Sequence, residues 1–225
     1  MEYKVISHMD RLSVVSESYR KLRTNIDFSS FDEELKVINI TSSMPSEGKS
    51  INLLNLATVY AQNDKDVVVV DLDLRRPKMH RAIGERNILG VSDYCARKLP
   101  LEECIKHTKF GFDCMVAGKK IPYPSELLNS QKLKDLISLL KEEYEYIFID
   151  CPPANMVTDA NIISRYCDGT IFVVRNNYTD KRIAKRAIKS LRDINVNVIG
   201  AIVTRVKKKD TKYGIYYGVG DYYGE

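Results

Sequence analysis

Residues 37–50 read VINITSSMPSEGKS, and this stretch decides the fold. Its first part, residues 37–41, is a short run rich in β-branched residues and predicts a strand. Its last part, residues 43–50, matches the phosphate-binding P-loop pattern, with serine in place of the first glycine. A helix is expected directly afterwards, over residues 51–62. A strand, a loop and a helix in this order form the setting in which backbone N–H groups bind phosphate.

The residues of this loop have distinct expected roles. Gly48 lets backbone N–H groups close on a β-phosphate, because it has no side chain in the way. Lys49 is expected to reach the β- and γ-phosphate oxygens, and the Ser50 hydroxyl is expected to ligate Mg²⁺. ATP and Mg²⁺ are therefore the predicted ligands. The predicted nucleotide-binding residues are Ser43, Pro45, Ser46, Glu47, Gly48, Lys49, Ser50 and Ile51.

Short β-branched runs alternate with longer amphipathic segments along the chain. The predicted strands are residues 37–41, 67–71, 114–117, 146–150, 170–174 and 198–204. The predicted helices include residues 51–62, 130–143 and 181–194, with a further helix at about 13–29. Nearly continuous apolar strands are typical of a parallel sheet that is covered on both faces, so the fold class is α/β with a mostly parallel central sheet flanked by helices. Residues 1–206 are predicted to form one domain, and residues 207–225 a flexible tail.

The composition fits this reading. The chain has 225 residues, of which 44% are hydrophobic and 29% charged, enough for one domain with a real core. Lys and Arg (35) exceed Asp and Glu (30) only slightly, which permits contact with phosphates without requiring it. Five cysteines without a CxxC pair favour reduced thiols over a disulfide framework or a zinc site. No signal peptide and no run of about 18 apolar residues is present, so we expect a cytoplasmic protein.

Two aspartate motifs follow predicted strands. VVVVDLDLR contains Asp71 and Asp73, and YIFIDCPP contains Asp150. Ligands of open α/β sheets bind at the carboxyl ends of the strands, so these side chains are expected to converge near the P-loop, with Asp71 and Asp73 pointing the same way. Asp73 and Asp150, together with Ser50, are predicted to bind Mg²⁺, and Asp71 to orient or deprotonate an acceptor hydroxyl. The alternative is that the aspartates only cap helices or form turns.

Taken together, the motifs resemble those of the bacterial tyrosine kinases of capsule and exopolysaccharide assembly. The resemblance covers nearly the whole chain, through the P-loop at 43–50, the aspartate motif at 67–76, the DCPP sequence at 150–153 and PYPSELL at 122–128. It implies a P-loop NTPase fold and an ATP-dependent protein-tyrosine kinase. The catalytic residues that it implies are Lys49, Asp71, Asp73 and Asp150.

An ExxRxxR pattern lies in the predicted first helix, formed by Glu17, Arg20 and Arg23. These residues lie off the apolar stripe that begins with Val15 and ends with Ile26, so they are expected to project outward. The family resemblance implies that they make subunit contacts in a ring-like homo-oligomer. The alternative is a solvated helix face with an ion pair between Glu17 and Arg20.

The end of the chain is rich in tyrosine and glycine. It carries Tyr213, Tyr216, Tyr217, Tyr222 and Tyr223, five of the 14 tyrosines in the chain. The resemblance implies that these are phosphoacceptors, modified by a neighbouring subunit, and that the added negative charge loosens the ring. A tail that stacks on nucleic acid is the alternative, and nucleic acid is not the expected partner.

The resemblance also implies a membrane protein that anchors and activates the kinase at the inner face of the cell membrane, and other protein-tyrosine substrates. Two other functions remain open. One is a spatial-organising ATPase for septum or DNA positioning, although such ATPases usually carry an extra lysine where this chain has Met44 and Pro45. The other is a non-catalytic, nucleotide-switched scaffold for polysaccharide assembly. The basic segment 181–189 is either a solvated face or a surface for a partner or phospholipid headgroups.

Overall fold

A seven-stranded sheet lies at the centre of the computed structural model, which describes residues 3–29, 35–97 and 99–206. The strands are ordered β3-β4-β2-β5-β1-β6-β7. Their bounds are β1 Val37–Ser42, β2 Val67–Asp71, β3 Lys106–His107, β4 Asp113–Met115, β5 Tyr146–Asp150, β6 Gly169–Arg175 and β7 Val198–Thr204. Every neighbouring pair is parallel except β3 and β4. The predicted α/β class with a mostly parallel sheet is confirmed.

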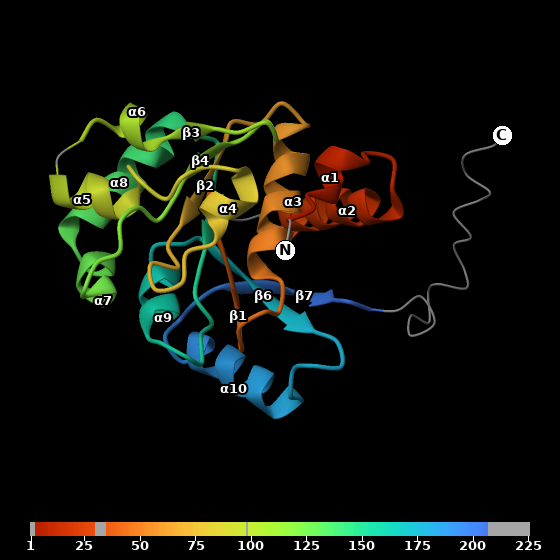
Figure 1. The fold of residues 1–225 in the computed structure, drawn as a ribbon. Helices are drawn as coiled ribbons and strands as arrows, with labels where there is room; N and C mark the ends of the chain where they lie inside the picture. The colour runs from red at the N-terminus through yellow and green to blue at the C-terminus, as the bar shows by residue number, and fades with distance from the viewer. Residues whose placement is uncertain (1–2, 30–34, 98, 207–225) are drawn as a thin grey trace.

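Helices cover both faces of this sheet (Figure 1). One layer contains α1 Ile6–Met9, α2 Val14–Ser29 and α3 Lys49–Ala61. The remaining helices are α4 Met79–Ile83, α5 Val91–Arg97, α6 Leu101–Cys104, α7 Pro124–Leu128, α8 Gln131–Glu143, α9 Asp159–Ser164 and α10 Lys181–Arg192. Among the described residues, no helix combines the length and apolar character needed to cross a membrane.

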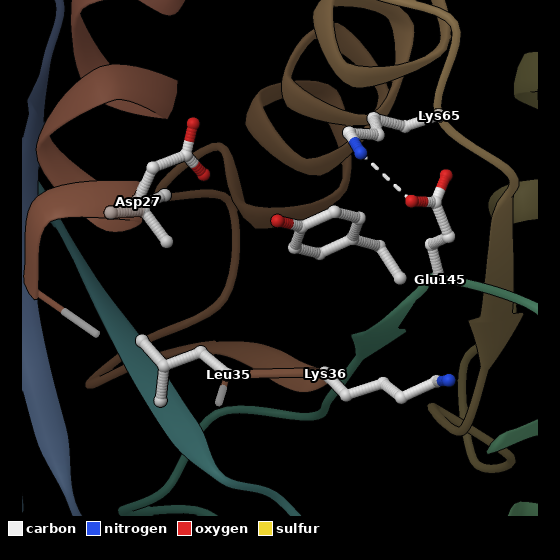
Figure 2. A pocket seen from close by; sticks show the side chains of 7 residues that line it. Asp27, Leu35, Lys36, Lys65 and Glu145 are labelled. Carbon is white, nitrogen blue, oxygen red and sulfur yellow. Dashed lines mark hydrogen bonds and ion pairs between the residues drawn. The ribbon is translucent and has the colours of Figure 1, made fainter. Parts of the chain in front are cut away.

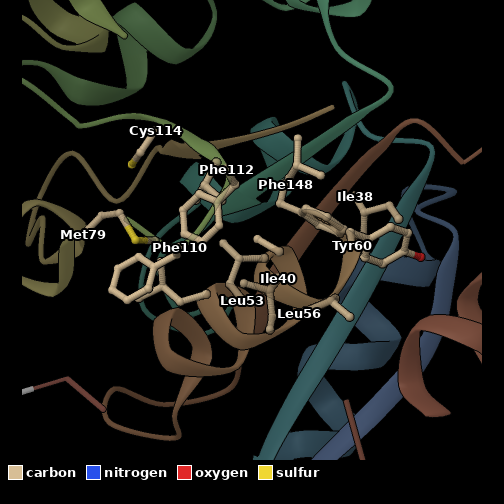
Figure 3. Close-up of a cluster of buried hydrophobic side chains, with 14 of the residues drawn as sticks. Ile38, Ile40, Leu53, Leu56, Tyr60, Met79, Phe110, Phe112, Cys114 and Phe148 are labelled. Carbon is tan, nitrogen blue, oxygen red and sulfur yellow. The ribbon is translucent and has the colours of Figure 1, made fainter. Parts of the chain in front are cut away.

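The core explains why the strands read as almost unbroken apolar runs. Alternate residues of a strand point to opposite faces, and both faces are buried in β1, β2 and β5, whereas the edge strand β7 is partly exposed. Ile38 and Ile40 of β1 lie in the same cluster as Tyr60 of α3, whereas Val37 belongs to the cluster on the other side of the sheet (Figure 3). The ring of Tyr60 lies 5.2 Å from that of Phe148 on β5. Helix α3 is therefore a central core element as well as the helix that follows the P-loop.

One strand was missed by sequence reasoning. The two-residue strand β3 pairs antiparallel with β4, placing His107 opposite Asp113. A two-residue strand is too short to produce a hydrophobic period. β4 itself ends at Met115, two residues before the predicted end of that strand. These differences lie at the far edge of the sheet from the P-loop.

The predicted first helix is present as α2, with a different buried face at its start. Val15 was expected on the apolar stripe but its side chain is 49% exposed, and Ser16 is fully buried instead. The Ser16 hydroxyl donates to the backbone oxygen of Asp10 at 2.6 Å, within the turn that leads into the helix. This local hydrogen bond sets which residue of the first turn faces inward. Further along α2, Ile26 is buried as expected.

The sheet brings the motifs to one edge. β1 lies between β5 and β6, and β5 lies between β1 and β2. In the register of β2 and β5, Asp71 is directly opposite Asp150. The P-loop follows the carboxyl end of β1, so it leaves the sheet at the same edge as both aspartates.

Candidate active site

The P-loop adopts a conformation that its sequence permits. Ser46 and Gly48 have positive φ angles of 64° and 103°. A side chain at Gly48 would be strained at this angle, and its Cβ would lie 3.1 Å from the Asn52 amide nitrogen. Helix α3 begins directly afterwards at Lys49, whose side chain is buried. The loop therefore ends at a helix N-terminus, the arrangement predicted for phosphate binding.

The Glu47 side chain braces the loop from within. It is 1% exposed, and its carboxylate accepts hydrogen bonds from the Met44 N–H at 2.6 Å and from the Ser43 hydroxyl at 3.1 Å. The Thr179 hydroxyl also donates to this carboxylate. Because its carboxylate is occupied by these hydrogen bonds, the predicted contact of Glu47 with a nucleotide stays a prediction for its backbone.

Residues distant in the sequence close over the P-loop, and sequence reasoning did not find them. The guanidinium of Arg175 donates to the Ser46 backbone oxygen at 3.3 Å. The Thr204 hydroxyl, at the end of β7, donates to the backbone oxygen of Glu47 at 2.9 Å. Arg175 and Thr204 are the last residues of β6 and β7, so only the strand order of the folded sheet could have identified them. They hold the loop against the neighbouring strand ends.

The two principal motifs meet through Ser50 and Asp150. The Ser50 hydroxyl donates to Asp150 Oδ2 at 2.5 Å, although the residues are 100 positions apart. Burial raises the pKa of Asp150 to about 6, while the nearby Lys49 and the Ser50 hydrogen bond act in the opposite direction. The predicted convergence of Lys49, Ser50 and Asp150 is thus present in the structure. Their arrangement joins a cation, a hydroxyl and a buried carboxylate at the sheet edge.

Asp71 is the second buried carboxylate of the site. It is 0% exposed and accepts the N–H groups of Asp73 at 3.1 Å and Met79 at 3.2 Å. Its pKa is raised because it is buried and because the charges of Asp150 and Asp73 lie nearby. Asp71 therefore binds a proton more readily than an ordinary aspartate, and its predicted role toward an acceptor hydroxyl stays a prediction.

Asp73 is the third aspartate of the site. Strand β2 ends at Asp71, so the alternation that applies within a strand does not extend to Asp73. The Asp73 carboxylate instead accepts the N–H of Arg76 at 3.1 Å, in the turn after the strand. It still adds negative charge near the other two aspartates. The expected proximity of charge is present, and the expectation that Asp71 and Asp73 point the same way stays a prediction.

The donor groups of this site fit Mg²⁺. Asp150 Oδ1 is buried and has no hydrogen-bond partner among the described residues, while Oδ2 is bound to Ser50. A buried carboxylate oxygen without a partner is costly unless a cation or a donor satisfies it. Within the described part of the chain, no group of three or more Asp, Glu, His or Cys side chains forms a metal cage. Mg²⁺ commonly takes one or two protein carboxylates and completes its shell with phosphate oxygens and waters, so the free oxygen of Asp150 is a suitable ligand.

Arg75, the last residue of the DLDLR motif, has a partner that the sequence did not reveal. Its guanidinium makes two hydrogen bonds to the Asp159 carboxylate, of 2.6 Å and 3.0 Å. Asp159 lies at the start of α9 and is 1% exposed. A bidentate pair with one buried member fixes both position and orientation. It fastens the loop after β2 to α9, next to the aspartates.

The ExxRxxR residues of α2 are only partly directed outward. Glu17 and Arg20 form an ion pair of 2.8 Å on the helix surface, as the alternative interpretation predicted. Arg23, expected to project outward, instead donates to the Val59 backbone oxygen of α3 at 2.9 Å. The reason is that α2 packs along α3, so the backbone oxygen of Val59 lies within reach of the long side chain of Arg23. The role of these three residues in subunit contacts stays a prediction.

The predicted phosphoacceptors Tyr213, Tyr216, Tyr217, Tyr222 and Tyr223 lie outside the described residues, as does the whole predicted tail 207–225. The described chain ends at Val206, two residues after Thr204. Thr204, two residues before the end of this described segment, is bonded to the P-loop.

A hollow of about 240 Å³ lies elsewhere on the molecule (Figure 2). Lys36, Lys65 and Glu145 line it, and Lys65 and Glu145 form an ion pair of 2.8 Å. These residues lie immediately before β1, β2 and β5, so the hollow is at the amino ends of the strands. It is therefore at the opposite edge from the P-loop and is not part of the candidate site.

Comparison with known proteins gives consistent matches. Residues 35–196 match the family model described as an AAA domain. The chain is 36% identical over 223 residues to tyrosine-protein kinase YwqD of Bacillus subtilis (strain 168), covering 98% of this chain and 94% of that protein. It is 34% identical to the putative tyrosine-protein kinase CapB of Staphylococcus aureus, covering 92% and 91%. The solved kinase domain of Escherichia coli tyrosine kinase ETK is similar, with a TM-score of 0.85 and 29% identity, covering 92% and 83%.

Proposed function

Because the chain belongs to the bacterial tyrosine-protein kinases, we propose that it transfers the γ-phosphate of ATP to the tyrosines of its own tail. The observation that carries this proposal is the contact between Ser50 and Asp150, beside the buried Lys49. These residues come from the two motifs that a nucleotide site requires, and they meet at the edge where α/β sheets bind ligands. Thr204, near the end of the described residues, is bonded to the P-loop at this edge.

The chain's own residues account for nucleotide binding. The backbone N–H groups of the P-loop and the ammonium of Lys49 bind the β- and γ-phosphates. Ser50 and Asp150, with Asp73 nearby, would hold Mg²⁺. Bound there, Mg²⁺ neutralises phosphate charge that the buried carboxylates would otherwise repel. Arg175 and Thr204 keep the loop closed against β6 and β7.

Asp71 is the group that receives the acceptor's proton. An unperturbed tyrosine has a pKa of about 10, so its phenol needs a base to attack readily near neutral pH. A bond forms between the phenol oxygen and the γ-phosphorus, while the bond from that phosphorus to the β,γ-bridging oxygen breaks. ADP leaves with the bridging oxygen, and the phenolic proton passes to the Asp71 carboxylate. The raised pKa of Asp71 favours this transfer.

The tail tyrosines act as substrates between subunits. Glu17, Arg20 and the exposed start of α2 form the subunit contact of a ring, which brings one tail to the neighbouring site. Each phosphate adds roughly −1.5 to −2 charges, so several on one tail repel one another and loosen the assembly. A membrane partner recruits and activates the kinase at the inner face of the membrane, in the assembly of capsular or extracellular polysaccharide. This part of the proposal is supported by the family membership.

One experiment tests the proposal against its alternatives. The protein is incubated with ATP and Mg²⁺, with and without a cytoplasmic activator segment, while ADP release and phosphotyrosine are measured together. Mass spectrometry is expected to place phosphate on residues 213–223, and Lys49→Met is expected to abolish it. ADP release with an unmodified tail would instead indicate an organising ATPase. Nucleotide binding and assembly without either product would indicate a non-catalytic scaffold.

A further inference from the structure

Helix α2 is attached to α3, the P-loop helix, by side-chain hydrogen bonds at successive turns. The pairs are Tyr19 with Asn52, Arg23 with the Val59 backbone oxygen, and Tyr60 with Asp27. Two of these bonds use a tyrosine hydroxyl, one near the P-loop end of α3 and one near its far end. The two tyrosines therefore offer a comparison between a bond close to the nucleotide loop and a similar bond away from it.

The first bond continues into the P-loop. The Tyr19 hydroxyl donates to Asn52 Oδ1 at 3.0 Å. The amide nitrogen of the same Asn52 side chain donates to the Gly48 backbone oxygen at 2.6 Å. Gly48 has a φ angle of 103° and directly precedes Lys49. A continuous path of hydrogen bonds thus runs from the surface helix to the residue at which the P-loop turns into α3.

We propose that Tyr19 is a positioning residue for the nucleotide: through Asn52 it orients the Gly48 carbonyl, and thereby the turn that presents Lys49 and Ser50 to the phosphates. The inference rests on the proposed function in that the P-loop binds ATP. It goes further because it makes the packing of α2 against α3 a determinant of nucleotide affinity. A contact made on α2 by another subunit is then transmitted to the P-loop by this path.

The physical basis is the restricted freedom of the Asn52 amide. An asparagine side chain in a helix can rotate or bond elsewhere, and the hydroxyl of Tyr19 fixes its oxygen so that its nitrogen faces Gly48. Burial raises the pKa of Tyr19 to about 12, so its hydroxyl remains a donor across the ordinary pH range. The Gly48 oxygen also accepts the backbone N–H of Asn52 at 3.1 Å, so it is held twice by one residue. Without the Tyr19 hydroxyl, only the hydrogen bond from the backbone N–H of Asn52 still fixes the direction of the Gly48 oxygen.

The test compares Tyr19→Phe with the matched control Tyr60→Phe. Each variant removes one hydroxyl bond between α2 and α3 and keeps the aromatic ring. Affinity for a fluorescent Mg·ADP analogue is measured by titration, KM for ATP and kcat by phosphotyrosine formation, and the midpoint of thermal unfolding by calorimetry. For Tyr19→Phe we expect a Kd for the nucleotide about three- to tenfold higher, because a net hydrogen bond corresponds to about that factor. KM for ATP should rise in parallel with little change in kcat.

Tyr60→Phe is expected to lower the unfolding midpoint at least as much as Tyr19→Phe while its Kd for the nucleotide stays within about twofold of the parent. A double-mutant cycle with Asn52→Ala provides the second arm. If the path acts as a unit, Tyr19→Phe adds little once Asn52 has been replaced. Equal effects of Tyr19→Phe and Tyr60→Phe on nucleotide affinity, or an unchanged Kd in Tyr19→Phe, would overturn the inference. Because the Kd does not require phosphoryl transfer, a protein that binds ADP but forms no phosphotyrosine refutes the kinase proposal without deciding this one.

Discussion

The Ser50 hydroxyl lies 2.5 Å from Asp150 Oδ2 and connects the first turn of α3 to the end of β5. This contact joins the P-loop to the second aspartate motif across the sheet. It leaves the other oxygen of Asp150 buried without a partner among the described residues. The pair is therefore preorganised for a cation, and the rest of the site is arranged around it.

Ser50→Ala is expected to weaken the use of Mg²⁺ more than the fold. The change removes a hydroxyl that is both a predicted ligand and the partner of Asp150. The Mg²⁺ concentration for half-maximal phosphotyrosine formation should rise by about tenfold or more, the scale found when groups that support a metal are lost. Ser18→Ala is the control, since Ser18 lies on the exposed face of α2 and donates only to Val14. A Mg²⁺ requirement that does not change in Ser50→Ala would argue against the proposed metal position.

Asp150→Asn is expected to stabilise the nucleotide-free protein while abolishing kinase activity. Asp150 and Asp71 are buried carboxylates opposite each other in the register of β5 and β2. An amide removes one of two repelling charges, so the free energy of unfolding should rise by about 1–3 kcal/mol. Chemical denaturation without Mg²⁺ measures this. Asp135→Asn on the exposed face of α8 should change it by less than about 0.5 kcal/mol. A less stable Asp150→Asn protein would contradict this prediction, because it would show that neighbouring groups already stabilise the charge of Asp150.

Glu47→Ala is expected to loosen the P-loop. The change leaves the Met44 N–H and the hydroxyls of Ser43 and Thr179 without their buried acceptor. The expected cost is about 2–4 kcal/mol in the free energy of unfolding, together with weaker ADP binding. Glu47→Gln preserves the shape of the side chain. Its free energy of unfolding and its affinity for ADP should therefore lie between those of the parent and those of Glu47→Ala. Replacing the exposed Glu102 of α6 by alanine serves as the control. If Glu47→Ala binds ADP as tightly as the parent, the hydrogen bonds of Glu47 have no part in shaping the P-loop.

Arg75→Lys is expected to weaken the attachment of the DLDLR loop to α9. A lysine cannot reproduce the two parallel hydrogen bonds that Arg75 makes to the buried Asp159. The free energy of unfolding should fall by about 1–3 kcal/mol. Arg76→Lys, one residue along and exposed, should be nearly neutral. Equal effects of the two substitutions in urea denaturation would show that the pairing with Asp159 contributes nothing specific.

The sequence predicted those parts of the site whose residues lie within one motif. Gly48, Lys49 and Ser50 follow a strand and open a helix, so local pattern and backbone chemistry were sufficient. Asp71 and Asp150 were also found, because the carboxyl ends of parallel strands share one edge. The end of β2 at Asp71 agrees with the predicted strand, whereas the hydrogen bond from the Arg76 N–H to the Asp73 carboxylate, in the turn beyond it, was not predicted.

The remaining site residues depend on contacts between distant segments. Arg175, Thr179 and Thr204 reach the P-loop only because β6 lies next to β1 in the strand order and β7 lies next to β6. The same is true of Asp159 as the partner of Arg75. A sequence pattern specifies local geometry and burial, but it contains no signal for which side chains of separate elements meet. The inward turn of Arg23 toward α3 escaped prediction for this reason.

The position of the nucleotide tests the central claim most directly. A crystal structure of the protein with Mg·ADP is predicted to show the phosphates on the P-loop beside Lys49, with the metal ion between Ser50 and Asp150 and near Asp71. The metal–oxygen distances should be about 2.1 Å, as expected for Mg²⁺. Nucleotide bound elsewhere, such as the hollow at the amino ends of the strands, or a metal ion away from Asp150, would contradict the account.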